Sequence, residues 1–206
     1  MTAERKTKII GLAGGVASGK SLVAEQFAAR GAAVIDADRV GHEVLRDPQV
    51  RQLARQRWGE SIFDPDGHVN RRALAQIVFA SAPDGPRELA YLEQLTHGRI
   101  EQIVRQRIER LLEQPALAAV VLDAPLMFKA GWTAFCDKIV YVDAPREMRA
   151  ARARSRGWSE EEFARREAAQ QSLEEKCKHA DFVIDNSGPP EALKAQVDSA
   201  WTALVG

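Results

Sequence analysis

The chain has 206 residues, of which 45% are hydrophobic and 28% are charged, proportions that are ordinary for a globular protein with one well-filled core. Its 29 basic and 29 acidic side chains cancel, which excludes an overall field favouring nucleic acid or an anionic membrane and leaves any anionic ligand to a local cluster of positive charge. No apolar run approaches the roughly 18 residues of a membrane span, and no signal peptide is expected. Cys136 and Cys177 have no metal-ligand spacing and suit a reducing compartment, so we expect a cytoplasmic protein.

Short apolar runs alternate with helical patterns along the chain. The runs predict strands, and apolar residues at helical spacing after capping residues predict helices. In chain order, the expected strands cover residues 8–13, 32–35, 117–122, 138–142 and 182–184. The expected helices cover residues 19–30, 48–58, a segment after Asn70, 89–111, 146–180 and 190–204. The second of these has the apolar stripe Val50, Leu53, Ala54 and Trp58, and the pattern of 89–111 is interrupted at Thr96–Arg99. Turns are expected at Asp64–Gly67 and Pro83–Pro86.

This order of elements predicts an α/β fold with a doubly wound, parallel, five-stranded sheet. The helical stretch at about 40–115 is too long for one crossover, so we expect a single domain in which a helical lobe lies beside a core of about 1–40 and 115–206. Ligands of such sheets bind beyond the carboxyl ends of the strands. The acidic residues that end the predicted strands should therefore share the ligand-binding edge.

Residues 14–21, GGVASGKS, match the pattern G-x-x-x-x-G-K-[ST] at every fixed position and lie between a predicted strand and a predicted helix. The backbone N–H groups of such a loop curl around a phosphate, and the following helix directs its positive end at the same anion. Lys20 would reach the β- and γ-phosphates of ATP, and the Ser21 hydroxyl would ligate Mg²⁺. The alternative is a tight structural turn, but the strand-to-helix context favours nucleotide binding. The predicted ATP-binding residues of the loop are Gly14, Gly15, Val16, Ala17, Ser18, Gly19, Lys20 and Ser21.

A phosphate loop alone does not separate a GTPase from an ATPase or a small-molecule kinase. GTPases also need a base-reading motif [NT]-K-x-D, which does not occur in this chain. Residues 38–41, DRVG, fit the GTPase pattern D-x-x-G, but this pattern is weak and lies too close to the loop for a switch element. The sequence therefore disfavours a GTPase.

Asp38 follows the second predicted strand, at the edge where the phosphate loop is expected. A kinase needs a carboxylate at this place, to accept the proton of the acceptor hydroxyl or to hold Mg²⁺ through water. The alternative is that Asp38 caps the next helix. The two roles are compatible, because an aspartate at a strand-to-helix turn faces the ligand edge in both cases.

Five arginines are concentrated in a short segment after the fourth predicted strand: Arg146, Arg149, Arg152, Arg154 and Arg156. They could form a solvated helix face, balanced by the glutamates at 160–162. They could instead belong to a lid of about 146–172, in which arginine forks neutralise the charge of a transferring phosphoryl group while the lid excludes water. The phosphate loop favours the lid.

Segments spread over nearly the whole chain resemble the dephospho-CoA kinases, nucleotide-kinase-like enzymes with a phosphate loop. In order, the segments are IIGLAGGVASGKS, VIDADRVGHEVL, NRRALAQIVF, LEQLTHGRI, VLDAPLMF, the arginine segment with RGW, and ADFVIDNSG. The resemblance implies transfer of a phosphoryl group from ATP, with Mg²⁺, to the ribose 3′-hydroxyl of dephospho-CoA. The products would be CoA and ADP, in the last step of coenzyme A synthesis.

The same resemblance implies roles for particular residues. Asp38 would be the catalytic base, assisted by Lys20 and by the lid arginine Arg152. Arg156 would be a second lid arginine on the ATP side. The acceptor would lie in the helical lobe, and the adenine would lie near the last strand. The remaining implied contacts are Arg72 and His97 with the acceptor, and Asn186 with ATP.

Three positions depart from the family pattern: Leu22 replaces a threonine, Gly98 replaces a proline after His97, and Lys129 replaces an acid. The last change leaves residue 129 without an expected role. The alternatives to a dephospho-CoA kinase are another nucleoside or nucleotide monophosphate kinase, or a nucleotide-binding regulatory subunit without catalysis. The base, the lysine and the loop serine are all present, which disfavours the regulatory subunit. Beyond ATP and dephospho-CoA we expect no nucleic-acid or membrane partner, and we expect a monomer.

Overall fold

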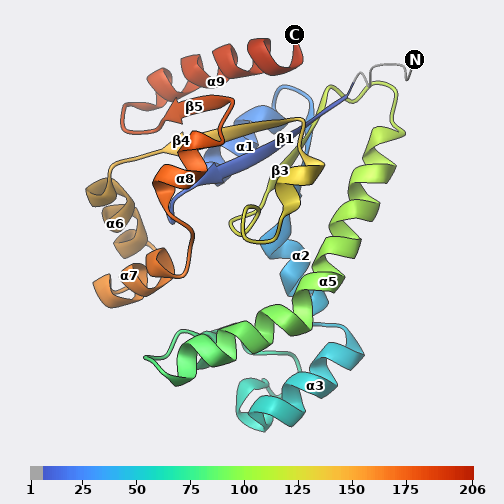
Figure 1. The fold of residues 1–206 in the computed structure, drawn as a ribbon, viewed down its shortest axis with the longest axis vertical. Coiled ribbons are helices and arrows are strands. Elements are labelled where there is room, and N and C mark those ends of the chain that lie inside the picture. The colour runs from blue at the N-terminus through green and yellow to red at the C-terminus, as the bar shows by residue number, and fades with distance from the viewer. Residues whose placement is uncertain (1–6) are drawn as a thin grey trace. The chain divides into compact units, whose positions relative to one another are not determined.

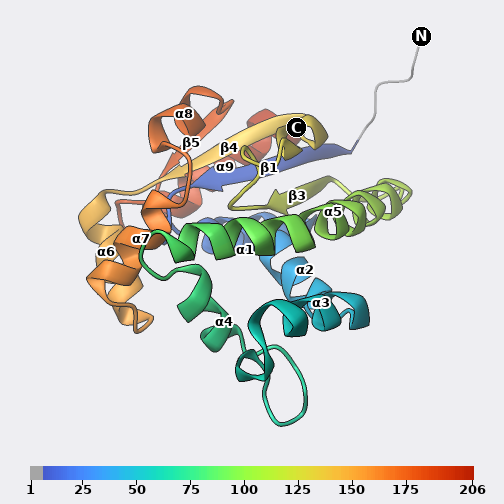
Figure 2. The same cartoon turned by 60° about the horizontal axis from the view of Figure 1, so that its bottom comes forward.

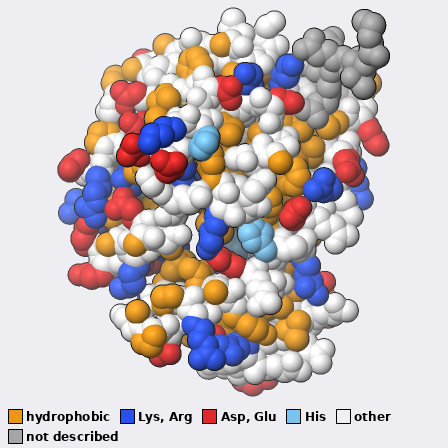
Figure 3. All heavy atoms as spheres, viewed as in Figure 1, with side chains coloured by type: hydrophobic (Ala, Val, Ile, Leu, Met, Phe, Trp, Pro, Cys, Tyr) orange, Lys and Arg blue, Asp and Glu red, His pale blue; other side chains and the backbone are white. Residues whose placement is uncertain are grey.

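The structure, a computed structural model of the chain, describes residues 7–206. It consists of two compact units (Figure 1). The first contains the residues up to Ala37 together with Arg107–Gly206, and the second is Asp38–Gln106. Within residues 7–206, none of the helices combines the length and the apolar character that a bilayer span requires. Basic and acidic side chains are interspersed over the face drawn in Figure 3, in keeping with their equal numbers.

The first unit contains a five-stranded sheet, and all its strands are parallel in the order β2-β3-β1-β4-β5. This confirms the predicted α/β fold. The inner strands β1 and β3 are buried on both faces, as a parallel sheet covered by helices requires, whereas Val34 of β2 and Val183 of β5, the two outer strands, are exposed. The strands are β1 (Lys8–Gly14), β2 (Ala32–Asp36), β3 (Ala119–Asp123), β4 (Lys138–Asp143) and β5 (Phe182–Asp185).

Two helices cover one face of this sheet. In α1 (Lys20–Ala28) the buried side chains are Val23, Ala24 and Phe27, and they share one core with α9 (Pro190–Val205) and the strands. Phe27 and Trp201 contact each other with ring centroids 5.8 Å apart. The remaining helices of this unit are η2 (Trp132–Phe135), α6 (Arg146–Ser155), α7 (Glu160–Ala168) and α8 (Leu173–Lys178). Figures 1 and 2 both show α6 and α7 side by side.

The carboxyl ends of the strands carry the acids that the sequence predicted for one edge. Asp36 is paired in register with Asp123, and Asp143 with Asp185. The loop after β1 begins at the same edge, because Gly14 is in register with Val142. The prediction that these acids share one edge is therefore confirmed.

The second unit is helical, and its helix starts follow from capping side chains. Asp47 Oδ1 accepts hydrogen bonds from the N–H groups of Gln49 and Val50, and Asn70 Oδ1 accepts from those of Arg72 and Ala73. The expected turn at Asp64–Gly67 is present. The elements are α2 (Ala37–Val44), α3 (Pro48–Trp58), η1 (Glu60–Ile62), α4 (Arg71–Val78) and α5 (Asp84–Leu112). Residue 37 and residues 107–112 of these helices belong to the first unit.

Three local predictions in this unit were wrong. Helix α5 continues through Thr96–Arg99 without a break, because Leu92, Leu95 and Ile100 pack in the core of this unit and Gly98 only weakens a helix by about 1 kcal/mol. The expected turn at Pro83–Pro86 is largely the first turn of α5, where proline is tolerated since those N–H groups have no helical partner. Leu53 is 37% exposed, while Val50 and Ala54 of the same stripe are fully buried.

Candidate active site

The loop between β1 and α1 has a backbone that requires glycine at two positions. Gly14 has φ 154°, and a Cβ there would lie 2.6 Å from Ser18 Oγ and from the Val142 carbonyl oxygen. Gly19 has φ 104°, and a Cβ there would collide with the Asn186 amide. Ala17 also has a positive φ, 59°, a conformation that costs a non-glycine residue about 1 kcal/mol or more. The loop backbone is therefore strained at Ala17 and depends on glycine at positions 14 and 19.

The amino-terminal end of α1 has donors available for an anion. Its N-cap is Gly19, which supplies no side-chain acceptor, and the first turn contains no acidic residue. The first N–H groups of a helix have no partner within the helix, and the helix dipole adds positive potential there. Lys20 is the first residue of α1, and Ser21 follows it with an exposed side chain. This geometry suits a bound phosphate.

Two side chains from distant segments hold the Ser18 carbonyl oxygen. It accepts one hydrogen bond from Asn186 Nδ2 at 2.7 Å and another from Arg152 Nη1 at 2.9 Å. The second guanidinium nitrogen, Arg152 Nη2, donates to the Asn186 carbonyl at 2.8 Å. Asn186 is 5% exposed, and its own N–H donates to the Asp143 carbonyl at 2.8 Å. The amide of Asn186 therefore supports the loop, and its contact with adenine stays a prediction.

Arg149 is a loop contact that was not singled out from the sequence. It is 3% exposed, and its guanidinium donates to the Ala144 carbonyl at 3.1 Å and to the Val16 carbonyl at 3.5 Å. It also forms an ion pair with Glu167 at 2.7 Å. Arg149 and Arg152 are three residues apart on α6, so both face the loop. Their three-residue spacing in the sequence was the signal that could have indicated a shared face. The structure brings both arginines to the loop at 14–21.

The other arginines that the sequence assigns to a lid lie differently. Arg154 and Arg156 have exposed side chains, and Arg156 is the C-cap residue, because α6 ends at Ser155 and Gly157 turns the chain at φ 83°. Among residues 7–206, no loop residue hydrogen-bonds to the Arg156 side chain. Arg156 as an ATP contact therefore stays a prediction.

The Arg149–Glu167 pair leads to a pH-dependent prediction. Burial opposes ionisation of the Glu167 carboxyl, but hydrogen bonds from Arg149 and Arg146 outweigh it and hold the pKa of Glu167 below its usual value. A carboxyl with a lowered pKa stabilises the fold above its unfolded-state pKa, and this contribution is lost as the pH falls through the folded-state pKa. We expect Glu167→Gln to lower the free energy of unfolding by about 1–3 kcal/mol at pH 7, with the deficit shrinking below about pH 4.

Urea unfolding at pH 7, 5 and 3.5 measures this effect. Glu160→Gln is the matched control, because Glu160 also pairs with Arg146, at 3.2 Å, but both side chains are about half exposed. An exposed pair of this kind contributes about 0–1 kcal/mol. Equal deficits in the two variants, or a deficit for Glu167→Gln that does not depend on pH, would contradict the prediction.

The predicted base and acceptor residues belong to the second unit. Asp38 lies in the first turn of α2, two residues after the strand-end Asp36. Arg72 lies in the first turn of α4 with an exposed side chain. His97 is half-buried in the middle of α5. Their roles stay predictions.

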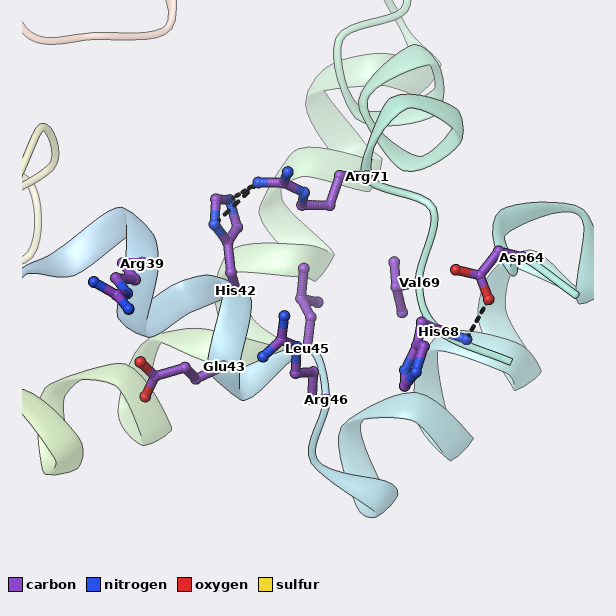
Figure 4. Close-up of a pocket in the computed structure, with 9 residues that line it drawn as sticks. All are labelled: Arg39, His42, Glu43, Leu45, Arg46, Asp64, His68, Val69 and Arg71. Atoms are coloured by element: carbon purple, nitrogen blue, oxygen red, sulfur yellow. Dashed lines mark hydrogen bonds between the residues drawn. The ribbon is translucent and has the colours of Figure 1, made fainter. Parts of the chain in front are cut away.

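The second unit also contains a cavity of about 710 Å³, called the basic cavity below, whose lining includes three arginines and two histidines beside two carboxylates (Figure 4). Figure 4 shows Arg71 and His42 pointing toward one another, with Arg71 Nη1 2.9 Å from His42 Nε2. His68 lies on the loop before α4, and its backbone N–H donates to Asp64 Oδ1 at 2.7 Å. Neither Arg72 nor His97 lines this cavity. The lining residues are Arg39, His42, Glu43, Leu45, Arg46, Asp64, His68, Val69 and Arg71.

The arrangement of sheet, loop and helix is that of the small α/β kinases. A shikimate kinase from Acinetobacter baumannii superposes with a TM-score of 0.53 at 14% identity, covering 97% of this chain and 93% of that one. A dephospho-CoA kinase from Campylobacter jejuni superposes with a TM-score of 0.65 at 20% identity, covering 97% and 98%. At these identities the likeness shows the fold.

Sequence comparison identifies the family within this class. The model of the dephospho-CoA kinase family matches residues 8–191, and the chain belongs to that family. A dephospho-CoA kinase of Symbiobacterium thermophilum is 40% identical over 203 residues, 97% of this chain and 82% of its own length. One from Aquifex aeolicus is 37% identical over 199 residues, 96% and 97%. The protein TT1252 from Thermus thermophilus superposes with a TM-score of 0.77 at 34% identity, covering 97% and 99%. The resemblance stated from the sequence is confirmed.

Proposed function

We propose that this chain transfers the γ-phosphoryl group of ATP to the ribose 3′-hydroxyl of dephospho-CoA, giving CoA and ADP. The observation that carries the proposal is the loop at 14–21, an anion-binding turn within a chain of the dephospho-CoA kinase family. As the 3′-oxygen attacks the γ-phosphorus, the bond to the leaving ADP oxygen breaks. Asp38 accepts the hydroxyl proton, and the loop N–H groups and Lys20 stabilise the phosphates.

We propose Mg²⁺ as the accompanying metal. Among residues 7–206 no three carboxylate, histidine or cysteine side chains are grouped to hold a metal ion by themselves. The exposed Ser21 hydroxyl beside the loop fits an ion that takes most of its ligands from ATP phosphates and water. When bound, Mg²⁺ would neutralise phosphate charge. The Arg152 and Arg156 guanidinium groups would add positive charge over the transferring group, and Asn186 would contact the adenine.

We propose that the helical second unit binds the acceptor. Dephospho-CoA carries a pyrophosphate, and the basic cavity there offers Arg39, Arg46 and Arg71 for such a group within a volume of about 710 Å³, in the usual range for ligand sites. Arg72 and His97 would make further acceptor contacts. We also propose a cytoplasmic location, since Cys136 and Cys177 are free thiols, as a reducing compartment favours.

The test is an acceptor comparison with purified protein, ATP and Mg²⁺. ADP release is measured with dephospho-CoA, AMP, CMP and nucleosides, and the product is identified by mass spectrometry. We expect turnover with dephospho-CoA and formation of CoA. Turnover with AMP or CMP instead would favour a nucleotide monophosphate kinase, and ATP binding without turnover on any acceptor would favour a regulatory subunit.

The basic cavity has its own test, through Arg71→Ala. Arg71 lines the cavity, and losing a charge-assisted contact with an anionic acceptor is expected to raise the KM for dephospho-CoA roughly 10-fold or more. The KM for ATP should stay unchanged, as measured by steady-state kinetics with each substrate varied in turn. Arg87→Ala is the control, because Arg87 is exposed and outside the cavity lining. Equal KM values for dephospho-CoA in the two variants would mean that the acceptor does not bind in this cavity.

A further inference from the structure

Helix α8 contains a buried lysine. Lys176 is 2% exposed, and its ammonium donates a hydrogen bond to Gln170 Oε1 at 2.9 Å. In the described part of the chain, no carboxylate lies within ion-pair distance of Lys176 Nζ. By contrast, Lys178 on the same helix is exposed and pairs with Glu174 and Glu175. Lys176 and Lys178 are thus two residues apart in the sequence, but one is buried without an ion pair and the other is exposed and paired.

The charged neighbours of Lys176 are mainly cations. Burial lowers the pKa of Lys176 to about 8, and the positive charges of Lys20 on α1 and Arg149 on α6 act in the same direction. Arg149 itself is paired with Glu167 on α7, and that carboxylate is also bonded to Arg146. Helix α8 also contacts β1, which is uncharged from Ile9 to Gly14. Among residues 7–206, no carboxylate forms an ion pair with Lys176 to compensate its charge.

This arrangement is costly unless an anion joins it. A buried ammonium beside two other cations loses its hydration and gains repulsion. A lysine that only packs its methylene stem would extend its ammonium to water, but this one is turned inward to a glutamine. Lys20 belongs to the phosphate loop, so the group that would relieve the repulsion is the polyphosphate expected there.

We propose that Lys176 is a phosphate-binding residue of the nucleotide site, held by Gln170 beside Lys20 and Arg149 and contacting an anionic oxygen of bound ATP. The proposal rests on the proposed function for the identity of the phosphate donor. It does not depend on the acceptor, so binding of ATP alone tests it separately.

Bound phosphate should return Lys176 to the fully charged form. With a pKa of about 8 in the free protein, about half of the ammonium groups are deprotonated at pH 8, so ATP binding at that pH should take up close to half a proton through this residue. Isothermal titration calorimetry of ATP with Mg²⁺, at pH 8 in two buffers of different ionisation enthalpy, measures that uptake and the Kd together.

The variants are Lys176→Met, Lys176→Arg and the control Lys178→Met. We expect Lys176→Met to weaken ATP binding roughly 10- to 100-fold, the effect of one charge-assisted hydrogen bond, and to lose the proton uptake. Lys176→Arg keeps the charge without titrating near pH 8, so it should bind ATP within a few-fold of the native chain without the uptake. Lys178→Met should match the native chain in both.

The proposal is overturned if Lys176→Met binds ATP as Lys178→Met does, or if either Lys176 variant retains the native proton uptake. If Lys176→Met does not fold, judged by circular dichroism, Lys176→Arg still decides through the uptake alone. A native chain that binds ATP with this uptake but does not phosphorylate dephospho-CoA would contradict the proposed function and leave the role of Lys176 supported.

Discussion

Asp38→Asn is expected to lower kcat by about 10²- to 10⁴-fold, the range typical of losing a general base. Asp38 lies in the first turn of α2, two residues after Asp36, the last residue of β2. Asparagine keeps the size and the capping ability of aspartate but cannot accept the proton of the attacking hydroxyl. The Kd for ATP should change little, because the loop, Lys20 and Arg152 are left intact.

Steady-state kinetics and ATP titration together check this expectation. Asp185→Asn is a suitable control, since Asp185 also ends a strand of the same sheet but its carboxylate accepts from the Ser187 N–H within a turn. A near-normal kcat in Asp38→Asn would mean that Asp38 is not the catalytic base and only stabilises the start of α2. In that case the free energy of unfolding would be expected to fall by about 0.3–1 kcal/mol, from the lost carboxylate–dipole interaction.

Arg152→Ala is the second change for which we expect a large effect. The guanidinium holds two carbonyl oxygens, on Ser18 and Asn186, and so places a full positive charge against the phosphate loop. Stabilisation of developing charge by one such donor typically changes kcat by about 10²- to 10³-fold. We expect a loss of kcat in this range and a smaller rise, less than about 10-fold, in the Kd for ATP.

Arg154→Ala controls for the arginine content of α6, because Arg154 lies on the same helix with an exposed side chain. Equal losses in kcat and in ATP affinity for Arg152→Ala would mean that Arg152 only supports the loop. The Tm of both variants, measured by thermal unfolding, shows whether a loss of kcat or of ATP affinity comes from unfolding of the protein instead. Arg156→Ala in the same series tests the second lid arginine.

The sheet and the phosphate loop could be predicted because their signals are local. Strands buried on both faces are continuous apolar runs, and the loop pattern encodes its own backbone geometry through Gly14 and Gly19. The break expected at Thr96–Arg99 was wrong, because Leu92, Leu95 and Ile100 around it pack in the core of the second unit and outweigh one glycine. Local propensity is a weak guide once a helix is this long.

The supporting residues of the site were harder to find. Arg149 and Arg156 are both arginines of one basic segment, so residue type alone does not distinguish them. Arg149 lies within α6 and contacts the loop, whereas Arg156 lies beyond the end of α6 at Ser155. Lys176 looks like Lys178 in the run LEEKCK, because six residues contain too little periodicity to assign a buried face. The cavity of the second unit is formed by α2 and by the loop before α4, whose apposition no short pattern encodes.

The two hydrogen bonds that Ser18 accepts have a consequence for how the enzyme is made. The loop is synthesised within the first 21 residues, but the side chains that hold its carbonyl come from residues 152 and 186. A growing chain on the ribosome therefore has β1 and the glycine loop long before their support exists. We expect the nascent protein to acquire its affinity for ATP only after the segment through Asn186 has emerged from the ribosome.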